Sequence, residues 1–170
     1  MTKEQTNKNA FLGKAATELT HVSSKQVLEI YKQRKILISV EVSSTLLFLF
    51  YNSHSSLADV ATDLNLPHQL IAKRVNKLLN LKLLKKQQDS KDKRRTELKL
   101  TKQGIFQAKL LQQCMNDMSV VYQELYQEIG CDLPKYLNDA INALNKKTIL
   151  ERFESNFGTG EEYEYPKKSD

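Results

Sequence analysis

The feature that most constrains the fold is a change of hydrophobic pattern along the middle of the chain. Residues 57–64 and 70–79 place apolar side chains at intervals of three and four, as amphipathic helices do. The segments LLKKQQ (83–88) and TELKL (96–100) have the period-two pattern and flanking residues of strands. Between them lies the basic stretch DSKDKRR (89–95). The pattern predicts two short helices followed by a hairpin with a basic turn.

The residues between the two helices indicate how they are joined. Ser56 is suited to cap the first helix, and Asn65 is suited to end it because Asn tolerates the left-handed conformation. Pro67 stands where the second helix begins, and proline is favoured in a first turn. Two helices with so short a connection form a helix-turn-helix. With the basic hairpin after it, the unit is predicted to be a winged helix.

The second helix has two chemically different faces. Its predicted inward face consists of Leu70, Ile71, Val75, Leu78 and Leu79. Its predicted outward face consists of His68, Gln69, Ala72, Lys73, Asn76 and Lys77. Gln and Asn can pair with adenine in the major groove, Lys can pair with guanine or phosphate, and alanine allows close approach. The same residues would also suit an ordinary solvated face.

Positive charge is concentrated in this part of the chain. Residues 67–102 contain twelve Lys and Arg against three acidic residues, a net charge of +9, although the whole chain carries only +6. A local positive field attracts polyanions and releases their counterions on binding. The alternative is that these lysines only make the surface soluble. A surface with both acidic and basic side chains would give the same solubility, so this alternative does not explain the local excess of positive charge.

The stretch DSKDKRRTELKLTKQG (89–104) resembles the wing of the MarR family of transcription regulators. That family has an Asp, two variable residues, Asp-Arg-Arg, a strand, and then Leu-Thr-x-x-Gly opening a long helix. The residues in register here are Asp89, Asp92, Arg94, Leu98, Leu100, Thr101 and Gly104. Lys93 replaces the first Arg, Lys82 stands where the family usually has Gly, and Pro67 occupies a place often held by Ser. The similarity covers roughly residues 38–106.

The resemblance implies a mostly α (α+β) fold, in which a winged helix-turn-helix is flanked by N- and C-terminal dimerisation helices. It implies that Arg94 reaches toward the minor groove, positioned by Asp92, while Lys91, Lys93 and Arg95 mostly meet phosphates. The predicted contacts to double-stranded DNA are Ser56, Pro67, His68, Gln69, Ala72, Lys73, Asn76, Lys77, Lys91, Asp92, Lys93, Arg94 and Arg95.

Amphipathic helices are expected on both sides of this domain. Two are predicted before it, over residues 9–22 and from the end of HVSS (21–24) to Leu37, and Ser39 is suited to cap a third. Thr101 is suited to cap a long helix ending at Gly130, and one last helix follows CDLP. The predicted divisions are 1–37 and 101–157 for dimerisation helices, 38–100 for the winged helix and 158–170 for a disordered tail.

The long helix carries an apolar seam too long for a small winged helix to bury, so a homodimer is predicted. An intramolecular bundle is the alternative. The predicted dimerisation residues are Phe11, Leu12, Ile105, Leu111, Met115, Met118, Tyr122, Leu125, Leu137, Ile141 and Leu144.

Other classes of function find little support. The usual nucleotide-binding, hydrolase and zinc motifs are absent from the sequence, so neither an enzyme nor a cofactor is expected. The three histidines lack metal-ligand spacing. Cys114 and Cys131 fall ~25 Å apart along one helix and cannot pair within the chain, which leaves a redox role open. No apolar run is long enough to span a bilayer and no signal peptide is apparent, so a cytoplasmic location is expected.

The family often responds to small phenolic or lipophilic effectors held between the dimer helices and the winged helix. Phe11, Tyr31 and Phe48 are candidates for the walls of such a site, and equally ordinary core residues, so the effector-binding residues stay unknown. Three functions remain: a ligand-responsive repressor bound to an inverted repeat, an effector-independent or architectural DNA-binding protein, and a protein-interaction module on a winged-helix scaffold.

Overall fold

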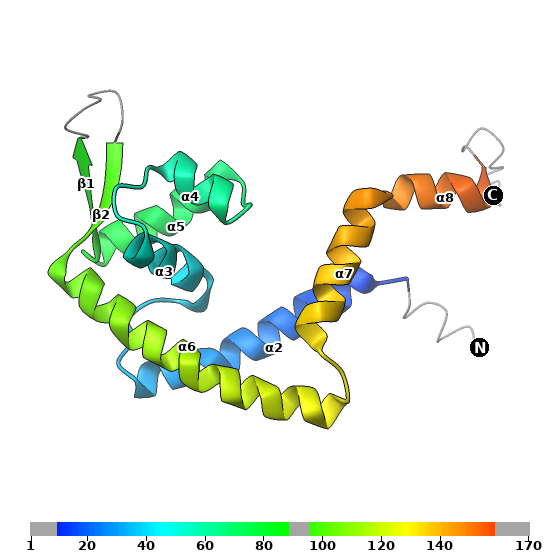
Figure 1. Ribbon diagram of the computed structural model, residues 1–170, viewed down its shortest axis with the longest axis horizontal. Helices are drawn as coiled ribbons and strands as arrows, with labels where there is room; N and C mark the ends of the chain where they lie inside the picture. The colour runs from blue at the N-terminus through cyan, green and yellow to red at the C-terminus, as the bar shows by residue number, and fades with distance from the viewer. Residues whose placement is uncertain (1–9, 89–95, 159–170) are drawn as a thin grey trace, which may run out of the picture. The chain divides into compact units, whose positions relative to one another are not determined.

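The computed structural model in Figure 1 describes residues 10–88 and 96–158. The chain divides into two compact units, residues 1–118 and 119–170. The described residues are mostly helical with one two-stranded sheet, as the sequence predicts. The elements, in order, are α2 (Leu12–Gln33), η1 (Val40–Val42), α3 (Ser43–Tyr51), α4 (Leu57–Asp63), α5 (His68–Asn80), β1 (Leu84–Gln88), β2 (Thr96–Leu100), α6 (Lys102–Ile129), α7 (Leu133–Lys146) and α8 (Ile149–Phe157).

The first unit has its core where α3, α4 and α5 pack beside the sheet (Figure 1). Leu46 of α3 and Ile71 and Leu78 of α5 are completely buried. Tyr31, near the end of α2, is buried as well, and its hydroxyl lies 2.8 Å from the Ser43 hydroxyl at the start of α3. These apolar positions of α2, α3 and α5 therefore contribute to the core of the first unit.

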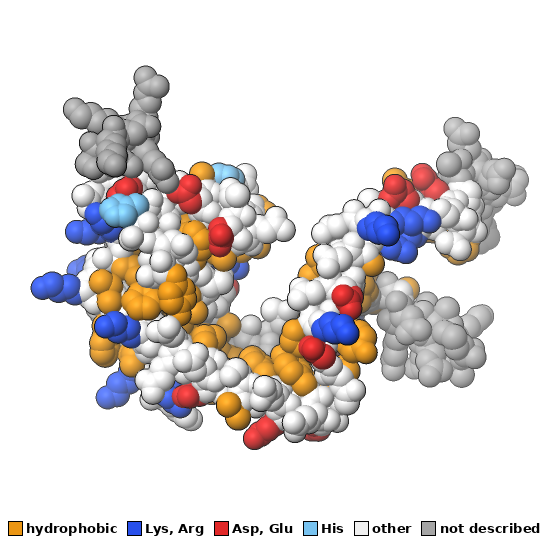
Figure 2. All heavy atoms as spheres, in the orientation of Figure 1, with side chains coloured by type: hydrophobic (Ala, Val, Ile, Leu, Met, Phe, Trp, Pro, Cys, Tyr) orange, Lys and Arg blue, Asp and Glu red, His pale blue; other side chains and the backbone are white. Residues whose placement is uncertain are grey.

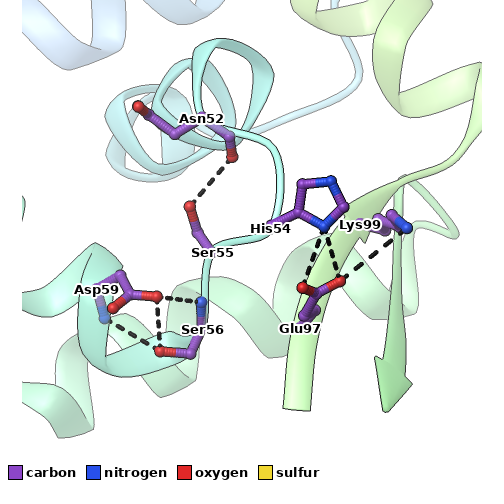
Figure 3. A network of polar contacts seen from close by, with 7 residues as sticks. All are labelled: Asn52, His54, Ser55, Ser56, Asp59, Glu97 and Lys99. Atoms are coloured by element: carbon purple, nitrogen blue, oxygen red, sulfur yellow. Dashed lines mark hydrogen bonds and ion pairs between the residues drawn. The ribbon is translucent and has the colours of Figure 1, made fainter. Parts of the chain in front are cut away.

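The connection between α4 and α5 follows the predicted turn chemistry. The Ser56 hydroxyl accepts a hydrogen bond from the Asp59 backbone N–H at 3.3 Å, and the Asp59 carboxylate accepts one from the Ser56 backbone N–H at 2.6 Å (Figure 3). This reciprocal capping box fixes the start of α4. Asn65 adopts the left-handed conformation with φ of 48°, and Pro67 immediately precedes α5.

The wing strands are antiparallel, with Leu84 opposite Leu100 and Gln88 opposite Thr96. The segment before α4 adds a short bridge to the middle of β2, because the Leu98 N–H donates to the Ser55 carbonyl at 2.8 Å. This bridge ties the hairpin to the helix-turn-helix. The sequence pattern did not predict it.

The start of α6 explains the Leu-Thr-x-x-Gly pattern. The Thr101 hydroxyl donates to the Lys82 carbonyl at 2.8 Å and accepts from the Gly104 N–H at 3.0 Å, so Thr101 caps α6 as predicted. A Cβ at Gly104 would lie 2.0 Å from the Leu83 carbonyl oxygen. Lys82 has a φ of 56°, the left-handed conformation for which glycine is preferred. Lysine therefore adopts here a conformation that is more common for glycine.

Two polar contacts tie α6 to the end of α2. The buried Gln107 side chain accepts from the Leu37 N–H at 2.8 Å and donates to the Lys35 carbonyl at 3.2 Å. Ten residues after Gln107 in α6, Asp117 forms an ion pair of 2.8 Å with Arg34. Together these contacts fix the linker that leads from α2 into the winged helix.

Three local predictions differ from the structure. HVSS does not interrupt the first helix, because Ser23 bonds back to the Thr20 carbonyl and α2 continues to Gln33. Ser39 precedes η1 but makes no side-chain capping bond. The last predicted helix is two helices, because the Thr148 hydroxyl caps α8 through a capping box with Glu151.

In the second unit, neither α7 nor α8 has a buried residue. Asp132 caps α7 by accepting from the Lys135 N–H at 3.1 Å. At the junction of the two helices, Arg152 of α8 donates from its guanidinium to the carbonyls of Ala143 and Lys147. These contacts use polar atoms and leave the apolar faces of both helices exposed.

Candidate nucleic-acid interface

Helix α5 presents most of its predicted outward face to solvent. His68, Gln69, Lys73 and Asn76 are exposed, and Ala72 is half-buried. On the inward face, Ile71, Val75 and Leu78 are buried and Leu79 is half-buried, as predicted. Leu70 is the exception, since 37% of its surface is exposed. The exposed face therefore consists mainly of side chains that can hydrogen-bond to base edges or phosphates.

Lys77, another predicted DNA contact, is held differently. Its ammonium group pairs with the Glu41 carboxylate of η1, and this hydrogen bond with Lys77 lowers the pKa of the Glu41 carboxyl despite partial desolvation. The guanidinium of Arg74, which the sequence reasoning did not single out, donates to the Ser44 hydroxyl of α3 at 3.2 Å. These two cations bind α5 to the preceding helices.

Two further predicted contacts sit at helix starts. Ser56 is half-buried, and its hydroxyl both accepts from the Asp59 N–H and lies 2.9 Å from the Asp59 carboxylate (Figure 3). Pro67 is exposed and occupies the N-cap position of α5. Both residues have a structural role at the helix ends, in addition to the contacts predicted for them.

The wing strands support a turn whose predicted contacts lie outside the described residues. These contacts are Lys91, Asp92, Lys93, Arg94 and Arg95. In the wing sheet, both carboxylate oxygens of buried Glu97 lie 3.1 Å from Nδ1 of His54, and Lys99 Nζ lies 4.0 Å from one of them (Figure 3). Sequence reasoning missed this cluster, since 43 residues separate its two main members.

The predicted dimerisation residues fall into two groups. Leu111 and Met118 are buried within their own chain, so they serve its core and not an exposed seam. The others are exposed or half-buried. The exposed ones are Phe11, Leu12, Ile105, Leu125, Leu137 and Ile141, and the half-buried ones are Met115, Tyr122 and Leu144.

The two cysteines and the potential metal ligands were the remaining candidate groups. Cys114 is a free, buried thiol whose pKa is raised by desolvation, and Cys131 is also free. Residues 10–88 and 96–158 contain no cluster of three potential metal ligands. Within the same ranges, no helix is both long and apolar enough to cross a bilayer.

Comparison with known proteins agrees with this architecture. Residues 43–104 match the family model described as a winged helix DNA-binding domain. The S. aureus MepR–DNA complex has a similar fold, with a TM-score of 0.58 and 21% identity over 75% of this chain and 97% of that chain. Adhesin competence repressor (AdcR) of Streptococcus pyogenes gives a TM-score of 0.53 and 18% identity over 80% of this chain and 97% of that chain. A search of curated protein sequences found no match.

A third similar structure is a mutant of Lactococcus lactis ZitR, with a TM-score of 0.51 and 17% identity over 78% of this chain and 97% of that chain. At these identities, the similarity establishes the fold. The family match and the structural similarities together cover both the winged helix and much of the flanking helices.

Proposed function

The chain contains a winged helix DNA-binding domain within a MarR-type fold, and on this premise we propose that it is a sequence-specific transcription regulator. The observation that carries the proposal is the exposed polar face of α5 within a segment of net charge +9. Gln69 and Lys73 lie one turn apart near the start of this helix, where a recognition helix contacts base edges.

Two tests separate base readout from general attraction to DNA. Binding-site selection with wild type and with Gln69→Ala should return different consensus sequences, because a bidentate contact contributes ~1–3 kcal/mol of discrimination. Arg94→Ala, at the wing position implied by the resemblance, should weaken operator binding in fluorescence anisotropy at moderate salt. An unchanged consensus would remove Gln69 from the readout, and unchanged affinity would remove Arg94.

The same proposal includes a homodimer on an inverted repeat. Two recognition helices related by a two-fold axis enter successive major grooves ~34–36 Å apart, so half-sites should lie about 10 base pairs apart. Exposed apolar side chains outside the winged helix support a partner copy, because water contact with so many of them is unfavourable. Sedimentation should give a particle of twice 19.6 kDa.

Response to a small effector is supported by a pocket of about 630 Å³ between α2 and the segment 39–41. Ala16, Leu28 and Val40 give it apolar walls, while Thr20 and Glu41 give it polar groups. Of the wall residues predicted from the sequence, Tyr31 is instead buried against Ser43. Glu41 also forms an ion pair with Lys77 of α5. A ligand in this pocket that moves Glu41 would therefore act on the recognition helix through this ion pair.

Binding of a phenolic probe to this pocket would alter DNA affinity only if it prefers one of two conformations. We therefore expect 4-hydroxybenzoate to shift operator affinity in anisotropy titrations of the wild type. The same titration with Thr20→Phe, which fills the pocket from an exposed helix position, should show no shift. If Thr20→Phe responds like wild type, the probe acts elsewhere; if neither protein responds to a panel of such probes, the regulator is effector-independent.

A further inference from the structure

The wing sheet has one buried carboxylate, and it lies at the end of the sheet next to the basic segment 89–95. Glu97 is the second residue of β2, which begins at Thr96 directly after that segment. Thr96 itself is exposed, and so are all residues of β1 after Leu84. Glu97 is therefore the buried residue of the sheet that lies nearest in sequence to the predicted wing contacts.

The Glu97 carboxylate is held by His54, in the loop between α3 and α4. Both oxygens lie 3.1 Å from His54 Nδ1, and Nδ1 is the donor because an ionised carboxylate can only accept (Figure 3). Lys99 Nζ, at 4.0 Å, is too distant for a hydrogen bond. Burying a carboxylate is unfavourable unless it is hydrogen-bonded, so this contact is what allows Glu97 to be buried. Figure 2 shows a histidine side chain exposed over the wing strands, next to acidic and basic side chains.

The backbone of His54 is held in an unusual conformation. Its φ of 70° lies in the left-handed region, which residues other than glycine seldom adopt. The loop is fixed on both sides: the Ser55 hydroxyl donates to the Asn52 carbonyl at 3.1 Å, and the Ser55 carbonyl accepts from the Leu98 N–H at 2.8 Å (Figure 3). A backbone outlier that is held by its surroundings points to a function for the residue that adopts it.

Contacts with the helices decide how the wing is oriented, because a two-stranded sheet is only marginally stable by itself. Buried Leu84 and Leu98 attach the sheet to the core. The contact between Glu97 and His54 is the attachment closest to segment 89–95 among those of the described residues. A segment that is already held in its bound orientation loses less conformational freedom when it binds, so affinity rises.

From this arrangement we propose that His54 and Glu97 are positioning residues of the DNA interface. Their hydrogen bond holds the wing strands in the orientation in which segment 89–95 and α5 contact one duplex together. The inference rests on the proposed DNA binding and extends it to two residues that are not themselves DNA contacts. Their effect on affinity passes through the side chains of the wing, such as Arg94.

The first measurement is made on the free full-length protein. Hydrogen–deuterium exchange of the β2 amides should be about three- to tenfold faster in His54→Gly than in wild type, as a lost hydrogen bond implies. Glycine adopts the left-handed conformation readily, so this variant removes the side chain and keeps the turn.

His54→Asn is the conservative variant that should rescue the contact. Asn tolerates the left-handed conformation, and its side-chain nitrogen is as many bonds from Cα as Nδ1 of histidine. Its β2 amides should exchange as in wild type. Lys99→Gln is the matched control for charge: it removes the other cation near Glu97, at 4.0 Å, and should also leave exchange unchanged.

The second measurement is operator affinity by fluorescence anisotropy. His54→Gly should weaken binding about three- to tenfold, and His54→Asn should restore it. In an Arg94→Ala/Arg95→Ala background, His54→Gly should cause no further loss, because the side chains that it positions are gone. In a Lys73→Ala background the full loss should remain, since α5 contacts DNA independently of the wing.

Other outcomes overturn the proposal. Unchanged exchange in His54→Gly does so directly, and so does faster exchange without loss of affinity, which would leave the contact a purely structural one. Equal effects of His54→Gly and His54→Asn would exclude the hydrogen bond as the cause. A full loss in the Arg94→Ala/Arg95→Ala background would show that His54 contacts DNA itself.

Failure of the proposed function gives a different result. If wild type binds no duplex, DNA binding is wrong, whereas the exchange measurement still decides whether His54 holds the wing. Circular dichroism verifies that each variant is folded. If His54→Gly is not, Glu97→Leu removes the same hydrogen bond from the acceptor side and takes its place in both measurements.

Discussion

The winged helix and the C-terminal helices differ in how far their apolar side chains are buried within the chain. In the first unit, α3, α4 and α5 bury Leu46, Val60 and Ile71 completely within the same chain. In the second, α7 and α8 have no buried residue, although Ile141 and Phe153 stand on strongly amphipathic helices. Helices α3, α4 and α5 can therefore complete a core within one chain, whereas exposed apolar faces like those of α7 and α8 favour association with another surface.

The largest effect is expected where the first unit is packed most tightly. Gly104→Ala would place a Cβ 2.0 Å from the Leu83 carbonyl oxygen, so α6 or the turn before β1 must move. We expect a loss of more than ~3 kcal/mol of unfolding free energy, above the ordinary cost of overpacking. Urea denaturation followed by circular dichroism measures this change.

Gly13→Ala is the matched control for this glycine. No atom lies within 4 Å of its added Cβ, and alanine is favoured over glycine in a helix by up to ~1 kcal/mol. Gly13→Ala should therefore leave stability unchanged or raise it. A similar loss in both variants would mean that the contact with Leu83 does not account for the Gly104 effect.

Sequence reasoning succeeded where local chemistry decides the structure. Ser56, Asn65 and Thr101 carry the capping and left-handed roles that their side chains favour, and the strand pattern locates β1 and β2. It failed at HVSS, because serine can bond back to a helix carbonyl as readily as it can cap a new helix. It also overlooked Thr148 and Glu151, a capping box visible in the sequence.

Long-range contacts were beyond the sequence pattern. The Glu97–His54 contact joins residues that are distant in sequence, and the pairing of Lys77 with Glu41 depends on how η1 approaches α5. Periodicity marked Leu111 and Met118 as apolar helix positions but gave no means to tell a core contact from a dimer contact. The sequence therefore predicted which face of α5 is exposed. It did not predict that Lys77 on this helix forms an ion pair within the chain.

The second prediction tests whether the exposed faces of the C-terminal helices are an interface. Leu137→Glu/Ile141→Glu places two charges on the exposed apolar face of α7, one turn apart. We expect sedimentation to change from a dimer to a 19.6 kDa monomer, with thermal unfolding of the winged helix retained. Operator binding should fall with the loss of the second recognition helix.

Asn138→Glu/Asn142→Glu is the control for this change, since it adds the same charge at the same spacing on neighbouring positions of α7. It should remain dimeric. Wild type sedimenting as a monomer at micromolar concentration would contradict the dimer, the inverted repeat and the interpretation of the exposed faces together.

The third prediction concerns the contact between α6 and the linker after α2. Gln107→Leu removes an acceptor from the Leu37 N–H and a donor from the Lys35 carbonyl, and leaves two backbone groups without these partners. Each of these part-buried hydrogen bonds contributes a net ~0.5–1.5 kcal/mol, so we expect a loss of about 2 kcal/mol in denaturant unfolding. Gln103→Leu, on the exposed side of the same helix, should change stability by less than about 0.5 kcal/mol.

The smallest effect is expected for the pair between Glu41 and Lys77, because about half of each side chain is exposed. The pKa of the Glu41 carboxyl is lowered in the folded chain, mainly by its hydrogen bond with Lys77, so this contribution is complete above the ordinary pKa of 4.5. It disappears as the pH falls through the lower folded pKa, when the carboxylate is protonated. A double-mutant cycle of Glu41→Gln and Lys77→Gln should give a coupling of at most ~1 kcal/mol at pH 7, and none well below pH 4.5. Coupling that persists in acid would show that the two side chains interact through packing and not through charge. The close packing of the first unit would then include this half-exposed pair.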